Sequence, residues 1–203
     1  MASRSKRNNR VAARDFIEEA LATAREAKDK FGIARSLNML GDLARAAGDD
    51  VTARPLYEEA LTICRPLGNQ FAISNILINL AAAEYGQADY ASASAHFAEG
   101  LTMAQESATG VVGDKIAISY ALDGSAALAI RRGEAALAAQ LAGAAEQLRD
   151  SFNYHIEPAE RRFRDAYLES TRALLSETGF AEAYGEGRKL KLDEAVALAL
   201  SKK

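Results

Sequence analysis

Residues 37–64, LNMLGDLARAAGDDVTARPLYEEALTIC, are followed forty positions later by a similar stretch at residues 77–104, LINLAAAEYGQADYASASAHFAEGLTMA. The two stretches align without a gap. Among the positions at which residues of the same chemical type coincide are the pairs Leu40 and Leu80, Asp49 and Asp89, Ala53 and Ala93, Tyr57 and Phe97, and Leu61 and Leu101. A repeat at one fixed offset indicates an architecture of stacked, similar units.

Each unit has the pattern of two helices joined by a tight turn. In the first helix Leu37, Leu40 and Leu43 recur at helical spacing and share one face. The pattern breaks at Gly48, where two aspartates follow as candidates for a helix N-cap. A second helical pattern then runs to a stop near Gly68. Because Ala and Leu are abundant and β-branched residues are sparse, we predict an all-α fold.

The forty-residue offset divides the chain into helical units. We expect a half repeat at residues 11–32, helix pairs at 33–68, 71–107 and 114–150, and a C-terminal helical extension at 151–203 packed on the last pair. The polar, basic residues 1–10 are expected to be disordered. Because the first unit holds only a second helix, we expect the chain to be part of a longer protein or to have lost N-terminal repeats.

The composition excludes several classes of function. The 25 basic and 28 acidic side chains leave a net charge of −3, so we expect no direct nucleic-acid partner. No segment approaches the ~20 apolar residues of a membrane span, and the N-terminus lacks the apolar run of a signal peptide. The single cysteine, Cys64, cannot form an internal disulfide, which favours a reducing compartment. We therefore predict a cytoplasmic protein with no membrane partner.

The sequence offers no catalytic or metal-binding constellation. Its two histidines, His96 and His155, are distant in sequence, and with one cysteine they do not supply the three or four ligands that zinc needs. Cys64 falls on the apolar side of its helix, where we expect burial. Adjacent acids such as Glu18 and Glu19 point in different directions on a helix and do not converge on one substrate. We expect no enzyme activity, no cofactor and no metal.

Residues 34–67 resemble the tetratricopeptide repeat. That family favours a large residue at its fourth position, Leu-Gly at the seventh and eighth, Ala at the twentieth, an aromatic at the twenty-fourth and Ala at the twenty-seventh. Here those positions hold Leu37, Leu40-Gly41, Ala53, Tyr57 and Ala60, whereas Ala44 replaces the usual aromatic at the eleventh. The resemblance implies a right-handed superhelix of antiparallel helix pairs, an α-solenoid, here with extra C-terminal helices. It also implies that the partner is a protein or a peptide.

The last third of the chain has a second resemblance. The stretches LAGAAEQLRDSF, EPAERRFRDAYLESTRALL and FAEAYGEGRKLKLDEAVALAL, within residues 116–200, are similar to the C-terminal tails of large bacterial regulators. Those regulators combine a nucleotide-switched ATPase with tetratricopeptide repeats, often with a DNA-binding domain of the LuxR or antibiotic-regulator type. The resemblance implies a sensor or interaction arm in signalling or transcription regulation. The chain holds no G-x-x-x-x-G-K-[ST] motif, so any ATPase belongs to another part or another chain.

The tetratricopeptide resemblance implies a concave groove lined by the first helices. The candidate groove residues are Arg35, Asn38, Asp42, Arg45, Asn75, Asn79 and Tyr85. An Asn amide can both donate to and accept from a peptide backbone, and an Arg can hold a carboxylate. A merely solvated face fits the same residues equally well. A groove filled by the chain's own C-terminal helices is a further alternative.

A second candidate surface lies on the helix predicted at residues 11–31. Its apolar side chains include Phe16, Ile17, Leu21 and Phe31. Without a covering first helix they form an exposed end of the solenoid, which favours pairing with another copy or with upstream repeats. The sequence thus carries two hypotheses. One is a protein- or peptide-binding sensor module, and the other is a homodimerising structural scaffold without a peptide ligand.

Overall fold

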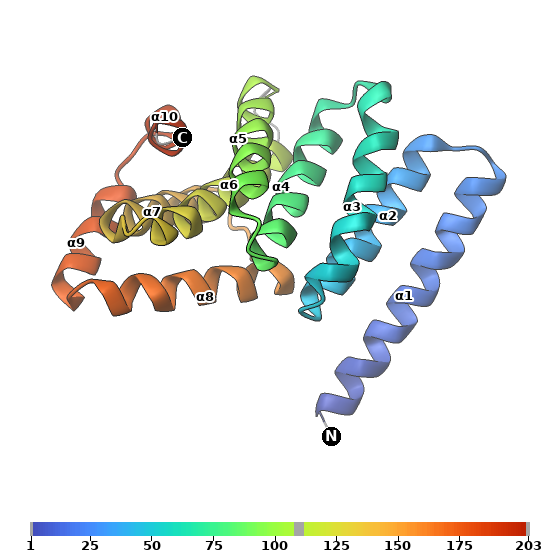
Figure 1. The fold of residues 1–203 in the computed structure, drawn as a ribbon, viewed down its shortest axis with the longest axis horizontal. Coiled ribbons are helices and arrows are strands. Elements are labelled where there is room, and N and C mark those ends of the chain that lie inside the picture. Colours follow the sequence, from blue (N-terminus) through green and yellow to red (C-terminus); the bar gives the residue numbers. More distant parts are fainter. Residues whose placement is uncertain (1, 108–111, 202–203) are drawn as a thin grey trace.

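The computed structural model describes residues 2–107 and 112–201, and in these residues it has ten α-helices, one short 3-10 helix and no strand. The helices are α1 (Ala2–Glu26), α2 (Lys30–Ala46), α3 (Asp50–Cys64), η1 (Arg65–Leu67), α4 (Gln70–Gly86), α5 (Tyr90–Glu106), α6 (Val112–Arg131), α7 (Ala135–Asp150), α8 (Pro158–Leu174), α9 (Glu177–Gly187) and α10 (Leu192–Leu200). Figure 1 shows α1 to α5 as a row of neighbouring helices, with α8 along one edge of the molecule. The all-α solenoid predicted from the sequence is confirmed.

Four turns of one kind set the length of the repeat. Each contains a residue with positive φ, and these residues follow one another at intervals of twenty: Lys28 (φ 55°), Gly48 (φ 87°), Gly68 (φ 68°) and Ala88 (φ 62°). The residue after each of them is an N-cap, whose side-chain oxygen accepts a hydrogen bond from the backbone N–H three positions further on. These N-caps are Asp29, Asp49, Asn69 and Asp89, with oxygen-to-nitrogen distances of 3.0, 3.0, 3.0 and 3.2 Å. Each cap stabilises its helix by about 1 kcal/mol. Two such turns per helix pair produce the forty-residue repeat.

The second helix of the first two pairs, α3 and α5, carries a buried aromatic ring. Tyr57 is 0% exposed and packs on Gly41 of α2, and Phe97 is 2% exposed and packs on Gly124 of α6. A Cβ on these glycines would lie 2.5 and 2.3 Å from the respective rings, so a larger residue does not fit. Each buried ring contributes about 2 kcal/mol of apolar burial. The buried apolar residues form two clusters that both include residues of α4.

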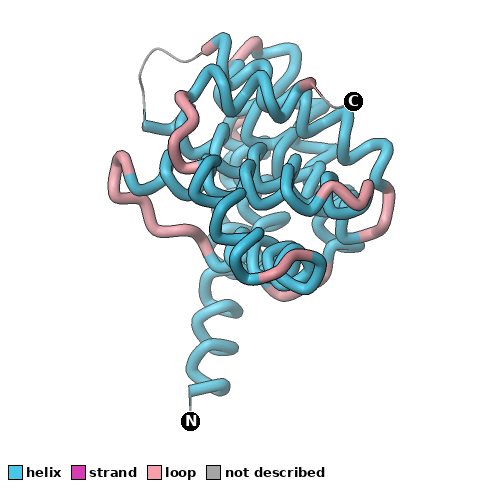
Figure 2. The backbone as a smooth tube through the Cα atoms, turned by 90° about the vertical axis from the view of Figure 1, so that its left-hand side faces the viewer, coloured by secondary structure: helices cyan, strands magenta, loops and turns pink. Residues whose placement is uncertain are grey.

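Helix α1 lies beside α2 at one end of the row and is longer than its neighbour. At the usual rise per residue, its 25 residues extend about 37 Å and the 17 residues of α2 about 26 Å. Figure 2 shows the N-terminal part of α1 projecting from the body. We expected residues 1–10 to be disordered, but the structure continues α1 back to Ala2. The physical reason is that these residues contain no proline or glycine that would end the helix.

The three C-terminal helices fold back on the solenoid. Helix α9 crosses α7 so closely that a Cβ on Gly143 would lie 2.1 Å from the carbonyl oxygen of Tyr184, and one on Gly187 would lie 1.9 Å from that of Gln140. Helix α10 packs against α5, α6 and α7. Helix α8 contacts α6 and α7 and also reaches α2 (Figure 1). The extension therefore touches the first helix pair as well as the last one.

Candidate protein-binding surface

Three of the seven candidate groove residues meet in one polar group on α2 and α4, which we call the amide cluster (Asn38, Asp42 and Asn79). The Nδ2 of Asn79 donates to Asn38 Oδ1 at 3.1 Å and to Asp42 Oδ1 at 3.0 Å. The Nδ2 of Asn38 donates to Asp42 Oδ2 at 3.3 Å, and the Tyr57 hydroxyl donates to Asp42 Oδ1 at 2.8 Å. All three members of the cluster are half-buried. The cluster joins the first helix pair to the second and still reaches the surface.

The electrostatics of the amide cluster are dominated by burial. Burial raises the pKa of Asp42, and this outweighs the nearby Arg45 guanidinium and the hydrogen bond from Tyr57, which lower it. Burial, with the Asp42 charge second, also raises the pKa of Tyr57, so its hydroxyl remains a donor at neutral pH. Among the described residues nothing donates to Oδ1 of Asn79. This oxygen and the second N–H of Asn38 are available to a ligand.

Two other candidate groove residues are covered by helix α8. Arg45 is 2% exposed and forms a buried ion pair with Glu160 of α8. The ring of Tyr85 packs edge-on against Phe163 of α8, with the centroids 5.3 Å apart. The chain's own helix occupies this part of the face. Arg45 is therefore not accessible to a separate ligand in this structure, and α8 covers part of Tyr85, which is half-buried. The alternative of a self-filled groove anticipated this contact.

A buried carboxylate fixes α8 to the third helix pair. Asp123 of α6 is 2% exposed and accepts hydrogen bonds from the Tyr167 hydroxyl at 2.5 Å and from Arg149 Nη1 at 2.7 Å. Arg164 of α8 lies 3.7 Å from Asp123 and 2.7 Å from Glu146 of α7. Burial raises the pKa of Tyr167, and the Asp123 charge raises it further, so this hydroxyl stays protonated. None of these residues was selected from the sequence.

The two remaining groove candidates lie in different surroundings. Asn75 is half-buried and donates to the carbonyl oxygen of Phe71 within α4 at 2.9 Å. Arg35 is exposed, and no described residue forms an ion pair with it. It lines a hollow between α1 and α2 rather than the amide cluster. Its guanidinium is free to bind a carboxylate.

The candidate self-association face is partly exposed. Phe16 is 72% exposed and Phe31 43% exposed, whereas Ile17 is half-buried. Leu21 differs from the expectation, because it is 7% exposed and belongs to the core formed by α1 to α4. It faces inward on the helical turn that packs on α2, so it is not part of an open face.

Reactive side chains elsewhere have structural roles. Cys64 is fully buried, as predicted from its helical position, and burial raises the pKa of its thiol. The Nδ1 of His96 lies 2.8 Å from the buried Glu84 carboxylate, and this hydrogen bond raises the pKa of the imidazole.

In the part of the chain that the structure describes, no group of three or more His, Cys, Asp or Glu could hold a metal ion. None of the described helices is long and apolar enough to cross a membrane.

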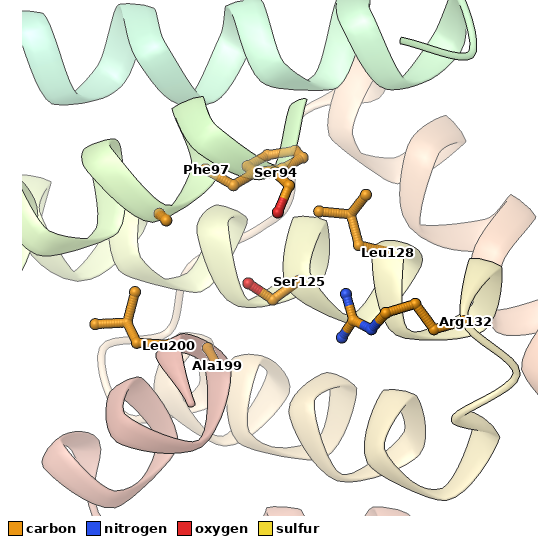
Figure 3. Close-up of a pocket in the computed structure, with 8 residues that line it drawn as sticks. Ser94, Phe97, Ser125, Leu128, Arg132, Ala199 and Leu200 are labelled. Atoms are coloured by element: carbon orange, nitrogen blue, oxygen red, sulfur yellow. The ribbon is translucent and has the colours of Figure 1, made fainter. Parts of the chain in front are cut away.

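A small pocket lies between α5, α6 and α10, and Figure 3 shows the side chains around it. Its lining consists of Ser94, Phe97, Ala98, Ser125, Leu128, Arg132, Ala199 and Leu200. Its volume of about 20 Å³ has room for about one water molecule. The pocket is too small for a substrate or a cofactor.

The fold and the surface define a class of protein. A row of antiparallel helix pairs with polar side chains on the face of its first helices is a helical-repeat scaffold, whose extended surface is suited to contact with other proteins. Residues 6–65 and 45–106 each match the family model of the tetratricopeptide repeat, so residues 6–106 are built of tetratricopeptide repeats. Such repeats generally mediate protein–protein interaction. A comparison with curated protein sequences gave no match.

Proposed function

We propose that this protein is a protein- or peptide-binding scaffold, and that its ligand contacts the amide cluster together with Arg35. The observation that carries the proposal is that α8 lies on the same face, with Glu160 on Arg45 and Phe163 on Tyr85. This contact supports the choice of this face as the ligand-binding surface, because a helix of the chain itself already packs on it. The amide cluster is left uncovered beside it and half-exposed.

The chemistry of the uncovered part favours a peptide with an accessible backbone and a carboxylate. Oδ1 of Asn79 and the second N–H of Asn38 form a donor and acceptor pair that matches a peptide group. Arg35 adds a planar cation that can hold a carboxylate with two hydrogen bonds. A ligand that spans both features lies across the N-terminal half of α2.

A phage-displayed library of random peptides, selected on the purified chain, tests this proposal. We expect the enriched peptides to bind Asn79→Ala and Arg35→Ala variants about 10-fold more weakly, because each substitution removes one polar contact worth about 1.4 kcal/mol. Thr62→Ala, an exposed position on α3, is the matched control and keeps full affinity. Circular dichroism confirms that each variant is folded. Failure to enrich any peptide, or equal binding to all variants, contradicts the proposal.

We further propose that the scaffold is the sensor or interaction arm of a bacterial signalling or transcription regulator in the cytoplasm. The support is the similarity of residues 116–200 to the tails of such regulators, together with the single cysteine and the net charge of −3. In such an assembly any DNA contact belongs to another domain. The purified chain should therefore give no mobility shift with duplex DNA at low salt, and a shift contradicts this assignment.

A further inference from the structure

Helix α8 contacts the first helix of each of the three pairs through side chains on one of its own faces. These side chains are Glu160, Phe163 and Tyr167, which contact Arg45 of α2, Tyr85 of α4 and Asp123 of α6, respectively. Their spacing of three and then four residues places them along one side of a helix. This is the arrangement by which an amphipathic helix binds in a groove on another protein.

The attachment of α8 depends more on polar contacts than on apolar burial. The buried apolar residues among its 17 are Ala159, Tyr167 and Leu168, whereas the 16-residue α7 buries seven apolar residues. The buried ion pair with α2 adds little net stability, because both charges lose their hydration when they are covered. The contact of Arg164 with Glu146 of α7, at 2.7 Å, is partly exposed. Helix α8 is therefore held less firmly than α7.

The charged groups beneath α8 keep partners of opposite charge when this helix leaves. One turn before Arg45 on the same helix is Asp42, which lies close enough for the Arg45 charge to lower its pKa. Asp123 keeps Arg149 of α7, whose Nη1 lies 2.7 Å from its carboxylate oxygen. Departure of α8 thus leaves neither Arg45 nor Asp123 without a counter-charge, and it lets water reach both.

The segments that flank α8 allow it to move while the helices on either side stay in place. Residues 151–157 separate α7 from α8, and residues 175–176 separate α8 from α9. Helix α9 crosses α7 at close backbone distance, and Arg188 Nη2 lies 2.8 Å from the Asp150 carboxylate at the end of α7. Because both ends of the intervening segment are fixed to α7, α8 can leave the face without unfolding α9 or α10.

We infer that α8 is a displaceable lid, and that the surface beneath it binds a helix of a partner protein with the same pattern of side chains. That pattern is an acidic residue, an aromatic residue three positions later and a tyrosine four positions after that. The acid pairs with Arg45, the aromatic ring packs on Tyr85, and the tyrosine hydroxyl donates to Asp123, as the side chains of α8 do. This surface is distinct from the amide cluster, so the inference does not depend on the proposed peptide site.

Hydrogen exchange of the wild-type chain, followed by mass spectrometry, tests whether α8 opens as a lid. The amides of α8 should exchange together, and about 10-fold or more faster than those of α7 and α9, because they are released without the rest of the fold. Equal protection of the three helices overturns the inference. This measurement needs no variant, so it decides the matter whether or not a variant folds.

Fluorescence anisotropy of a labelled peptide with the sequence of residues 157–175 tests the surface on the full chain. The double variant Glu160→Ala/Phe163→Ala weakens the attachment of α8 and leaves the surface beneath it unchanged. It should therefore bind the peptide about 10-fold or more tightly than the wild type does. Asp165→Ala, at an exposed position on α8, is the matched control and should bind the peptide as the wild type does. Circular dichroism confirms that each variant is folded.

A change in the peptide tests the pattern of side chains. A peptide that carries both alanine substitutions should bind the double variant at least about 10-fold more weakly than the natural sequence, because it lacks the contacts to Arg45 and Tyr85. Equal binding of the two peptides overturns the inference. So does a folded double variant that binds the natural peptide no more tightly than the wild type.

Discussion

The two ends of this solenoid differ in how far their terminal helices are covered. At the C-terminal end, α8, α9 and α10 cover the last helix pair, and the buried Asp123 binds side chains from α7 and α8. At the other end, α1 leaves Phe16 72% exposed over an open hollow. The comparison shows that a helix pair of this kind can be covered by further helices of its own chain or can leave apolar side chains exposed. The outcome depends on a few side chains and not on the repeat itself.

The largest effect is expected at the closed end, from Asp123→Ala. Removing this carboxylate leaves the buried Arg149 guanidinium with only the longer contact to Glu146, at 3.4 Å, and should cost about 3 kcal/mol in the free energy of unfolding. Urea denaturation followed by circular dichroism measures the loss. Asp165→Ala, at an exposed position on α8, is the control and should change the free energy by less than about 0.5 kcal/mol. Similar losses for both variants would mean that Asp123 does not hold the closed end together.

A somewhat smaller effect is expected where α9 crosses α7. Gly187→Ala places a Cβ against the carbonyl oxygen of Gln140, a backbone atom that cannot move aside, and should destabilise by about 2–3 kcal/mol. Gly185→Ala, two residues earlier on the same helix, meets no atom within 4 Å and should stabilise by up to about 1 kcal/mol. Thermal unfolding of the two variants gives the comparison. If they shift the melting temperature in the same direction, the close crossing is absent in solution.

A smaller effect, this time an increase in stability, is expected from a substitution in one of the repeating turns. Ala88 has a φ of 62°, which is unfavourable for a residue with a Cβ, so Ala88→Gly should stabilise the protein by about 1 kcal/mol. Ala47 precedes the equivalent turn and has a φ of −85°, so Ala47→Gly should give no gain. Chemical denaturation of both variants checks the prediction. A gain from both would show that the effect is unrelated to the left-handed turn.

The smallest effect concerns His96, in the middle of the molecule and independent of either end. Its pKa is raised by the hydrogen bond to Glu84, so protonated His96 stabilises the fold. That contribution is complete below the ordinary histidine pKa of 6.5 and is lost as the pH rises through the raised value. The wild type should therefore exceed His96→Gln in stability by about 0.5 kcal/mol at about pH 5.5 and by less at about pH 8.5. Denaturation at the two pH values measures this, and a difference that grows with pH contradicts it.

The repeated part of the fold was predictable because each local signal was strong. Gly48, Asp49 and Asp89 define the turns and caps, and the leucine spacing defines the first helices. The expected disorder of residues 1–10 differs from the structure, in which α1 begins at Ala2. The polar, basic composition suggested disorder, but no residue there breaks the helix. The candidate groove residues Asn38 and Asn79 were selected because the tetratricopeptide resemblance places Asn38 on the groove and Asn79 beside it, and in the structure the two side chains are in contact.

The course of α8 was not predictable, because it depends on contacts between residues far apart in sequence. Arg45 and Glu160 are one such pair, and nothing in the local pattern of either residue points to the other. Asp123 did leave a signal that was not used. When Gly133 is aligned with Gly48, Asp123 falls on the position of Asn38, so it belongs to the same face. A carboxylate at that position indicates a cationic neighbour, which Arg149 and Arg164 supply.

The attachment of α8 to its own solenoid has a consequence for competition. A covalently tethered helix is present at its binding surface at an effective concentration on the order of millimolar. A free peptide making equal contacts, present at a micromolar concentration, would displace α8 from only about one molecule in a thousand. Arg45, and the part of Tyr85 that contacts Phe163, therefore stay covered by α8 in the presence of such a peptide. At a micromolar concentration, a peptide that displaces α8 from half of the molecules must bind this face about a thousand-fold more tightly than α8 does. Only a high-affinity ligand can therefore compete with α8 for this part of the surface.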